Sequence, residues 1–496
     1  MEQLTPVVIF GIIAAYFLVL MAVSYWTGRN ADNNDFFIAN RQSPWYLVAF
    51  GMIGTSLSGV TFISIPGQVG AGGSNMAFSY MQIVFGYLLG YFVIATVLLP
   101  LYYRLKLISI YAYLEQRFGN NAYKTGAAYF LLSRTIGAAF RLYLVAIVFQ
   151  TVSTLTGLHI PFWLTVLVTI LLIWIYTFRG GMKTIVWTDT LQTLFMLVAV
   201  VMTIFAIGTA LEKNTGELIQ LIQQSDYSQL FFFEGGWSDP NNFFKQFISG
   251  ALIAIVMTGL DQDMMQKNLS CRSLKEAQLN MFSFSIVLVF VNVLFLALGA
   301  LLYIYANSIG LTIPEKTDLL YPILALEHLP PVAGIVFILG LIAAAYSSAD
   351  SALTALTTSF CVDFLGFEKE DNQIENKDKT RLQVHIGFSV LLFFVIIIFN
   401  TLSDDSVINT LFKMAGYTYG PLLGLFTFGM LTDLKVSNKW VIPICIAAPI
   451  LSYILNANDL FIGFKLGFLI ILINGLLTFL GLFAVSYRED PEEEIF

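Results

Sequence analysis

The stretch from 50 to 73, FGMIGTSLSGVTFISIPGQVGAGG, is apolar but carries the groups that an ion-binding site needs. Seven glycines and Pro66 weaken a continuous helix there, because glycine loosens the backbone and proline removes an N–H donor. In a membrane, carbonyls freed in this way must find a partner or line a cavity, and the serine and threonine hydroxyls add further oxygens. The pattern therefore predicts an ion and substrate site near the middle of a bilayer. Small residues are equally typical of close helix packing, so both interpretations stay open.

A second hydroxyl-bearing stretch, LGLIAAAYSSADSALTALTTS, lies in another apolar segment. Ala344, Ser347, Ser348 and Ser351 stand at i, i+3, i+4 and i+7, which places them on one face of a helix. Hydroxyls and freed carbonyls can hold a sodium ion without burying a full charge, although the same small residues also suit close packing. A cation site requires that this face meet the broken segment at 50–73.

Two acidic residues lie inside apolar segments. Asp189 stands about six residues, or roughly 9 Å, inside the expected membrane boundary, where a carboxylate is costly and usually marks an ion or proton path. The alternative is an acid near the membrane surface that pairs with Lys183 or Arg179. Asp350 is two residues away from the hydroxyl stripe, so it points elsewhere and we assign it no role in the ion site.

Basic residues inside an apolar segment are rarer still. Arg134 and Arg141 are seven residues apart and therefore share a helix face, with Arg141 near the middle of its segment. An arginine at that depth needs a carboxylate, a cluster of carbonyls or an anionic substrate. Its forked donors match a carboxylate in a bidentate manner. A structural pair with an internal acid is the alternative.

The composition indicates which class of protein positions these residues. The chain has 496 residues, of which 57% are hydrophobic and 11% charged, and its mean hydropathy is +0.77. These values exclude a soluble enzyme and predict an all-α polytopic membrane protein, with one transport domain over 1–496. The three cysteines and three histidines lack the spacing of a disulfide framework or a metal cluster. We expect no catalytic site, no nucleic-acid partner and a monomer as the functional unit.

The hydropathy pattern predicts about 13 membrane spans. They are 7–27, 44–68, 76–101, 123–150, 160–178, 184–211, 243–262, 277–305, 331–361, 384–400, 407–431, 440–456 and 461–486. Basic residues follow the odd-numbered spans, and few lie in the other loops, as positive-inside sorting requires. The basic residues after odd spans include Arg29, Arg41, Arg104, Lys106, Arg117, Lys124, Arg179, Lys183, Lys267, Arg272, Lys275, Lys369, Lys377, Lys379, Arg381, Lys435, Lys439 and Arg488. This places the N-terminus outside the cell membrane and the C-terminus in the cytoplasm.

The spans can be grouped into two sets of five. The first set covers 44–211 and the second 243–431, with an extra helix at 7–27 and two C-terminal helices at 440–486. An odd number of spans in each set gives the two sets opposite orientations, the arrangement of inverted-repeat transporters. The halves share no clear sequence identity, so this prediction is topological.

Four ordered motifs resemble the sodium–solute symporter family. They are GGMKTIVWTDTLQ at 180–192, DQDMMQKNLSCRSLKEA at 261–277, YAYLEQRFG at 111–119 and KMAGYTYGPLLGLFTFGML at 413–431. The resemblance covers nearly the whole chain and implies a leucine-transporter-type fold that works by alternating access. It also implies Na⁺ as the coupling ion. The residues implied for a first sodium site are Gly59, Phe62, Ala344, Ser347 and Ser348, and those for a second are Asp189 and Ser351.

The same resemblance guides the choice of substrate. Sugar-carrying members place a glutamate after a tyrosine in the second core helix, whereas Tyr80 here is followed by methionine. Members that carry sialic acid combine an arginine, a glutamine and hydroxyls at places comparable to Arg141, Gln82 and Thr61, and Phe78 could stack on the ligand. The resemblance therefore implies sodium-coupled import of an anionic, carboxylate-bearing solute, sialic acid first and a monocarboxylate next.

Other functions stay open at this point. A sodium-coupled sugar symporter is one alternative, and coupling to protons through Asp189 is another. A channel on the same scaffold would need a continuous polar pore, and the sequence has isolated polar sites between apolar spans. A nutrient sensor would need an attached signalling domain. We expect a symporter that works in the lipid bilayer rather than an enzyme, because no paired acids and no His or Cys cluster are evident.

Overall fold

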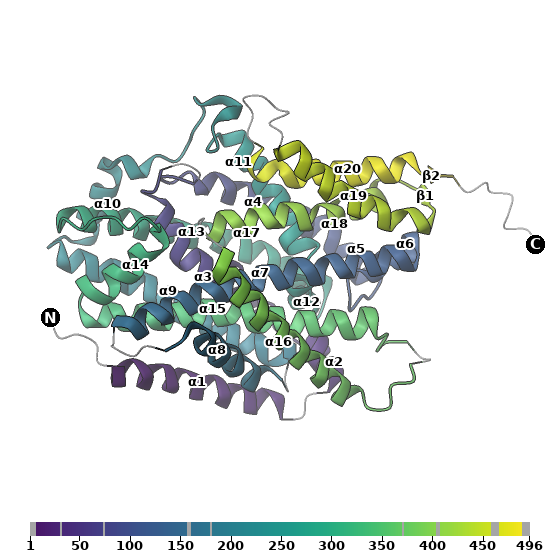
Figure 1. The fold of residues 1–496 in the computed structure, drawn as a ribbon, viewed down its shortest axis with the longest axis horizontal. Helices are drawn as coiled ribbons and strands as arrows, with labels where there is room; N and C mark the ends of the chain where they lie inside the picture. The colour runs from purple at the N-terminus through teal and green to yellow at the C-terminus, as the bar shows by residue number, and fades with distance from the viewer. Residues whose placement is uncertain are drawn as a thin grey trace, which may run out of the picture.

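The chain folds almost entirely into α-helices, most of which run along the long axis of the molecule (Figure 1). A computed structural model describes residues 6–29, 32–72, 75–155, 160–178, 181–369, 372–402, 407–457 and 466–488. The helices are α1 (Pro6–Gly28), α2 (Asn33–Ile38), α3 (Trp45–Gln68), α4 (Tyr80–Val93), α5 (Leu99–Arg104), α6 (Ala112–Phe118), α7 (Asn120–Leu155), α8 (Phe162–Thr177), α9 (Gly181–Ala210), α10 (Thr215–Gln224), α11 (Phe243–Ala254), α12 (Gln262–Leu269), α13 (Leu274–Ser308), α14 (Leu320–Ile323), α15 (Pro331–Ser359), α16 (Lys377–Leu402), α17 (Val407–Thr418), α18 (Gly420–Leu431), α19 (Asn438–Ala457) and α20 (Ile470–Ala484). Two short antiparallel strands, β1 (Lys435–Val436) and β2 (Ser486–Tyr487), pair near the end of the chain.

The number of helices that could cross a membrane is close to the predicted 13, but the exact count is not confirmed. Among the described residues, ten helices are long and apolar enough to cross a membrane, or eleven if α11 and α12, which meet at 65°, form one span. Each of the 13 predicted spans overlaps at least one observed helix. However, α8 and α18 are shorter than a typical span, and the start of the predicted span 461–486 lies outside the described residues.

The centre of the bundle is formed by α3 and α15. Their spans are 89% and 83% buried, compared with 22% for α16 and for α19, which therefore lie at the periphery. Small residues make this burial possible, because they let neighbouring backbones approach closely. A Cβ atom at Gly51 of α3 would lie 2.9 Å from the Cβ of Asp189, and one at Gly54 only 2.3 Å from the hydroxyl of Thr193. Glycine in α3 thus brings α9 against the central helix.

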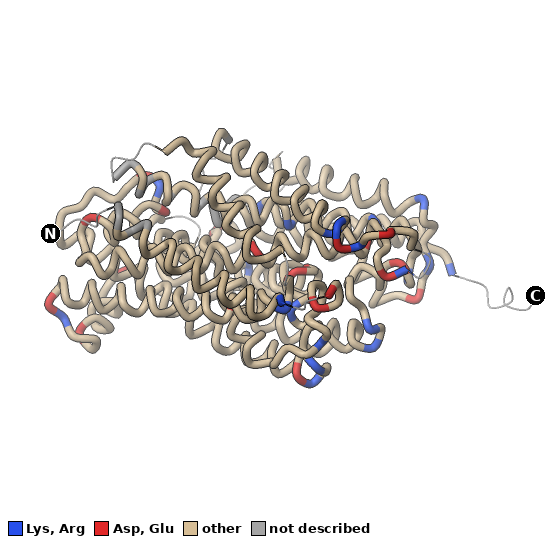
Figure 2. The backbone as a smooth tube through the Cα atoms, turned by 90° about the horizontal axis from the view of Figure 1, so that it is seen from below, with Lys and Arg blue, Asp and Glu red and all other residues tan. Residues whose placement is uncertain are grey.

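Charged residues lie mostly toward the two ends of the bundle. Figure 2 shows a long middle section with few of them, and lysines and arginines gathered toward the end where the chain terminates. Helix α1, the first described element, begins at the end of the bundle opposite to the one that holds β1 and β2 (Figure 1). A few charged residues lie in the middle section, where burial of a charge demands a partner.

A second close approach joins α4 to α11 and permits a stability prediction. A Cβ atom at Gly86 would lie 2.1 Å from the carbonyl oxygen of Phe247, which no side-chain adjustment can relieve. We expect Gly86→Ala to lower the free energy of unfolding by about 3 kcal/mol, the upper end of the usual cost of overpacking. Unfolding of the detergent-solubilised protein by SDS measures this change.

The matched control is Gly387→Ala in α16, where a new Cβ atom meets nothing within 4 Å. This variant should keep or raise the free energy of unfolding, by up to about 1 kcal/mol, because alanine restricts the unfolded chain more than glycine does. Equal stabilities of the two variants would contradict the packing assigned to Gly86.

Candidate functional site

The central helix α3 is broken at Ser58. This residue has φ 51° and ψ 175°, a backbone conformation that side-chain-bearing residues rarely adopt. The break interrupts the ladder of helical hydrogen bonds, so carbonyl groups in the preceding turn become available to other donors. Thr55 lies in that turn and is 1% exposed.

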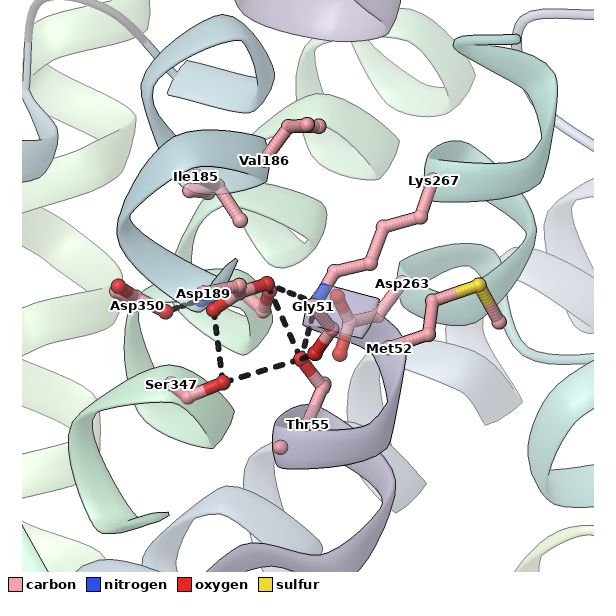
Figure 3. Close-up of polar contacts among 12 residues, drawn as sticks. Gly51, Met52, Thr55, Ile185, Val186, Asp189, Asp263, Lys267, Ser347 and Asp350 are labelled. Carbon is pink, nitrogen blue, oxygen red and sulfur yellow. Dashed lines mark hydrogen bonds and ion pairs between the residues drawn. The ribbon is translucent and has the colours of Figure 1, made fainter. Parts of the chain in front are cut away.

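The hydroxyls of α15 lie against this broken turn. The Ser348 hydroxyl donates a hydrogen bond to the backbone carbonyl of Thr55 at 3.1 Å. The Ser347 hydroxyl lies 3.2 Å from the Thr55 hydroxyl and donates to the carboxylate of Asp189 at 2.7 Å. Ala344 is buried one turn before them in α15. The structure thus brings together oxygens of α3, α9 and α15 in a buried site, shown in Figure 3.

The residue of α3 that contacts Ser348 is not one of the two that the family resemblance implies as sodium ligands. The observed contact with Ser348 is made by Thr55, one turn before the expected Gly59 and two turns before Phe62. The space beside Gly59 is bordered by the side chains of Ala345 and Val145, with no atom closer than 3.7 Å to an added Cβ. The ring of Phe62 packs in an aromatic cluster with three other buried rings. These are Phe295, Tyr321 and Phe337. The carbonyl oxygen that accepts from Ser348 therefore belongs to the turn before the break.

Asp189 has a partner that the sequence did not indicate. The ammonium group of Lys267 in α12 lies 2.5 Å from the Asp189 carboxylate, and both side chains are 2% exposed (Figure 3). Lys267 also donates a hydrogen bond to the hydroxyl of Thr55, which in turn donates to Asp189 at 3.1 Å. The placement of Lys267 in a cytoplasmic loop was wrong, because the bend between α11 and α12 turns this segment into the core. The expected partner Lys183 instead pairs with Asp35 at 3.1 Å, and Arg179 lies outside the described residues.

Ser351 and Asp350 form a separate polar group on α15. The backbone N–H of Ser351 donates to the Asp350 carboxylate at 2.6 Å, and the Tyr176 hydroxyl donates to the other carboxylate oxygen at 2.8 Å. The Ser351 hydroxyl is fully buried and makes no hydrogen bond with a described residue. Ser351 therefore shares a helix face with Ser347 but is not hydrogen-bonded to Asp189.

A cavity of ≈ 700 Å³, its open mouth included, adjoins the broken turn of α3. Thr61 and Arg141, both expected in the substrate site, line it. Arg134 also lines it, but this arginine forms an ion pair with Asp263 of α12. Arg141 is 7% exposed and forms no ion pair with a described residue. The cavity therefore contains one guanidinium group that is paired and one that is open to an anion.

Phe78 and Gln82, the other two residues expected in the substrate site, do not line this cavity. The Gln82 amide donates to the carbonyl of Asn241 at 2.8 Å and to the side chain of Gln246 at 2.9 Å, and it accepts from the N–H of Phe232. These bonds hold the start of α4 against α11 and the segment before it. The side chain of Gln82 is therefore used in structural hydrogen bonds, and we leave Phe78 and Gln82 out of the proposed site.

Several cavity residues were missed by sequence reasoning. Tyr80, Tyr87 and Tyr91 of α4 line the cavity, and the first two hydroxyls lie 3.1 Å apart. Their spacing of seven and four residues is a helical-face signal that could have identified them. Asn292 of α13 also lines the cavity, but an isolated polar residue carries no such signal. Ser56 of α3, another lining residue, belongs to the hydroxyl-bearing stretch 50–73 from which the site was predicted.

Comparison with known proteins identifies the chain. The model of the "Sodium:solute symporter family" matches residues 36–437. The chain belongs to this family. It is therefore a sodium-coupled membrane transporter rather than an enzyme, and the resemblance seen in its four motifs is confirmed.

Individual relatives of this symporter cover almost its full length. It is 26% identical to the sodium/sialic acid symporter NanT of Aliivibrio fischeri, over 97% of this chain and 94% of that protein. It is 27% identical to the sodium/sialic acid symporter SiaT of Proteus mirabilis, over 89% and 87% of the two chains. Its fold matches a substrate-bound, outward-open Na⁺-coupled sialic acid symporter with a TM-score of 0.81 and 21% identity, over 97% and 99% of the chains.

Proposed function

We propose that this symporter imports a carboxylate-bearing solute, with sialic acid the first candidate, by alternating access. The observation that carries the proposal is the guanidinium of Arg141, which forms no ion pair with a described residue, in a cavity beside the broken turn of α3. A buried arginine without an acidic partner is costly, and a carboxylate that docks on its fork removes that cost. The names of the two bacterial relatives support sialic acid as that carboxylate.

Sodium would bind where α3 and α15 meet. Ser347, Ser348 and the carbonyl of Thr55 supply oxygens from two helices, and carbonyl and hydroxyl oxygens suit this ion. Because the ligands come from separate helices, relative movement of α3 and α15 would take the site apart. Coupling then follows if sodium binds more tightly to the outward-open state, since a ligand shifts an equilibrium only through such a difference.

The proposed architecture is that of two inverted repeats, over 44–211 and 243–431. In its support, the first helix of each repeat is interrupted, α3 at Ser58 and the pair α11–α12 by a bend of 65°. Discontinuous helices in corresponding positions are typical of transporters built in this way. We further propose a monomer in the cell membrane, with the N-terminus outside and the C-terminus in the cytoplasm.

Uptake by the purified protein in liposomes tests the proposed function. An inward sodium gradient should drive accumulation of radiolabelled sialic acid, and its removal should abolish accumulation. Unlabelled hexoses should not compete. Competition by small monocarboxylates alone would move the assignment to that class, and uptake driven by a pH gradient without sodium would overturn sodium coupling.

The sodium site makes a specific prediction for Ser348. We expect Ser348→Ala to raise the half-saturating sodium concentration about tenfold, because losing one oxygen ligand costs about 1 to 1.5 kcal/mol. Sodium titration of uptake measures the change. Ser452→Ala is the matched control, since its buried hydroxyl donates to the Ala448 carbonyl of its own helix α19. An unchanged sodium requirement in Ser348→Ala would remove this residue from the site.

A further inference from the structure

The position expected for a second sodium ion already holds a cation. That site was expected at Asp189 and Ser351. The ammonium nitrogen of Lys267 lies 2.5 Å from Oδ2 of Asp189, and Ser347 donates to Oδ1 at 2.7 Å. Both carboxylate oxygens are therefore engaged.

The surroundings of this ammonium group resemble those of a bound sodium ion. Its partners are a carboxylate from α9 and the hydroxyl of Thr55 in the broken turn of α3, and the charge is buried with its side chain 2% exposed. Ammonium and sodium carry the same charge and seek the same oxygens. The hydroxyl of Ser351, the second expected ligand, is buried and makes no hydrogen bond with a described residue, Asp189 included. The residues present do not fit a second sodium ion while Lys267 occupies the site.

We propose that the Lys267 ammonium group is a built-in cation that replaces a second sodium ion, so that this symporter moves one sodium ion per solute. The inference rests on the proposed sodium-coupled transport and specifies its stoichiometry. Lysine remains attached to α12 through the cycle, so it neutralises Asp189 without contributing to the sodium gradient's driving force. Sodium is then left to the oxygens of Ser347, Ser348 and the Thr55 carbonyl.

The stoichiometry can be measured in two independent ways. Paired radiotracers in liposomes give the ratio of sodium to solute moved, and equilibrium binding of ²²Na⁺ to the solubilised protein gives the number of sodium ions bound without solute. We expect one by both measurements for the wild-type protein. Two sodium ions per wild-type molecule would overturn the inference while leaving sodium-coupled transport intact.

Variants at position 267 test whether the ammonium group is responsible. Lys267→Ala frees the Asp189 carboxylate, and we expect the number of bound sodium ions to rise from one to two. Lys267→Arg keeps the charge and should still bind one. A merely structural lysine would leave the number unchanged on either substitution, so a folded Lys267→Ala protein that binds one sodium ion would overturn the inference.

A double variant protects the test against failure of Lys267→Ala to fold. Asp189→Asn with Lys267→Met removes both charges together and leaves neither partner buried with an unmatched charge. We expect this protein to bind one sodium ion, because Asp189 is not a sodium ligand in the wild type. Loss of that sodium ion would show that Asp189 belongs to the sodium site and would overturn the inference. Sodium-independent uptake by the wild type would overturn the proposed function, and the inference with it.

Discussion

Replacing Arg141 with alanine should lower the affinity for the carboxylate-bearing solute by at least about thirtyfold and abolish measurable uptake. Truncating one partner of a buried, hydrogen-bonded charge pair typically costs about 2 to 5 kcal/mol, and each 1.4 kcal/mol is a factor of ten. Arg141 is the cavity-lining arginine that forms no ion pair with a described residue, so its loss removes the cation available to the solute. Uptake and solute-dependent thermal stabilisation both measure the effect.

Two controls separate solute recognition from folding. Arg141→Ala should keep its stabilisation by sodium, because the proposed sodium ligands lie on α3 and α15. Arg272→Ala removes an exposed arginine outside the cavity and should leave solute affinity unchanged. Arg141→Lys should recover only part of the affinity, since lysine offers a point charge rather than a fork. An unchanged solute affinity in Arg141→Ala would remove the assignment of this residue.

The parts of the site that could be predicted are those with a local signature. Four small or hydroxyl-bearing residues at helical spacing identified the inner face of α15, and clustered glycines identified α3 as interrupted. The exact carbonyl could not be predicted, because the break falls at Ser58, one of several positions with similar local preferences. The carbonyl that accepts from Ser348 belongs to Thr55, one turn before the Gly59 that the resemblance implies.

The part that could not be predicted depends on the path of the chain in three dimensions. Lys267 has the sequence context of a basic loop, in a segment with several polar residues after an apolar span. Its burial follows from the 65° bend between α11 and α12. The residues around Asp189 give no signal of an ion-pair partner 78 positions further along the chain. The same holds for Gln82, whose hydrogen-bond partners lie 150 to 164 residues further along the chain.

The charges around the cavity form a selective arrangement because one arginine is neutralised and the other is not. Arg134 and Arg141 are two turns apart on α7, and both line the cavity. Asp263, on the same bent segment as Lys267, pairs with Arg134. Helix α12 thus supplies the carboxylate that pairs with Arg134 and the ammonium group that pairs with Asp189. Its position therefore decides which charges are neutralised at both sites.

Removing the acid of this pair should destabilise the protein and alter its response to anions. Asp263→Asn leaves Arg134 buried, at 3% exposure, without a counter-charge, and we expect it to lower the free energy of unfolding by about 3 to 5 kcal/mol. The free guanidinium would become a second anion-binding group in the cavity. The stabilisation produced by a carboxylate-bearing solute should therefore be larger in Asp263→Asn than in the wild type.

The double variant Arg134→Met with Asp263→Asn removes both charges and serves as the control. Neutral replacement of a buried ion pair is often tolerated, so this protein should recover most of the lost stability. Its stabilisation by solute should return to the wild-type value, because Arg141 is again the one free guanidinium among the described cavity residues. SDS-induced unfolding with and without solute measures both effects. Equal stability of Asp263→Asn and the wild type would mean that the pair does not hold α12 against α7, and an unchanged solute effect would mean that Arg134 does not face the bound anion.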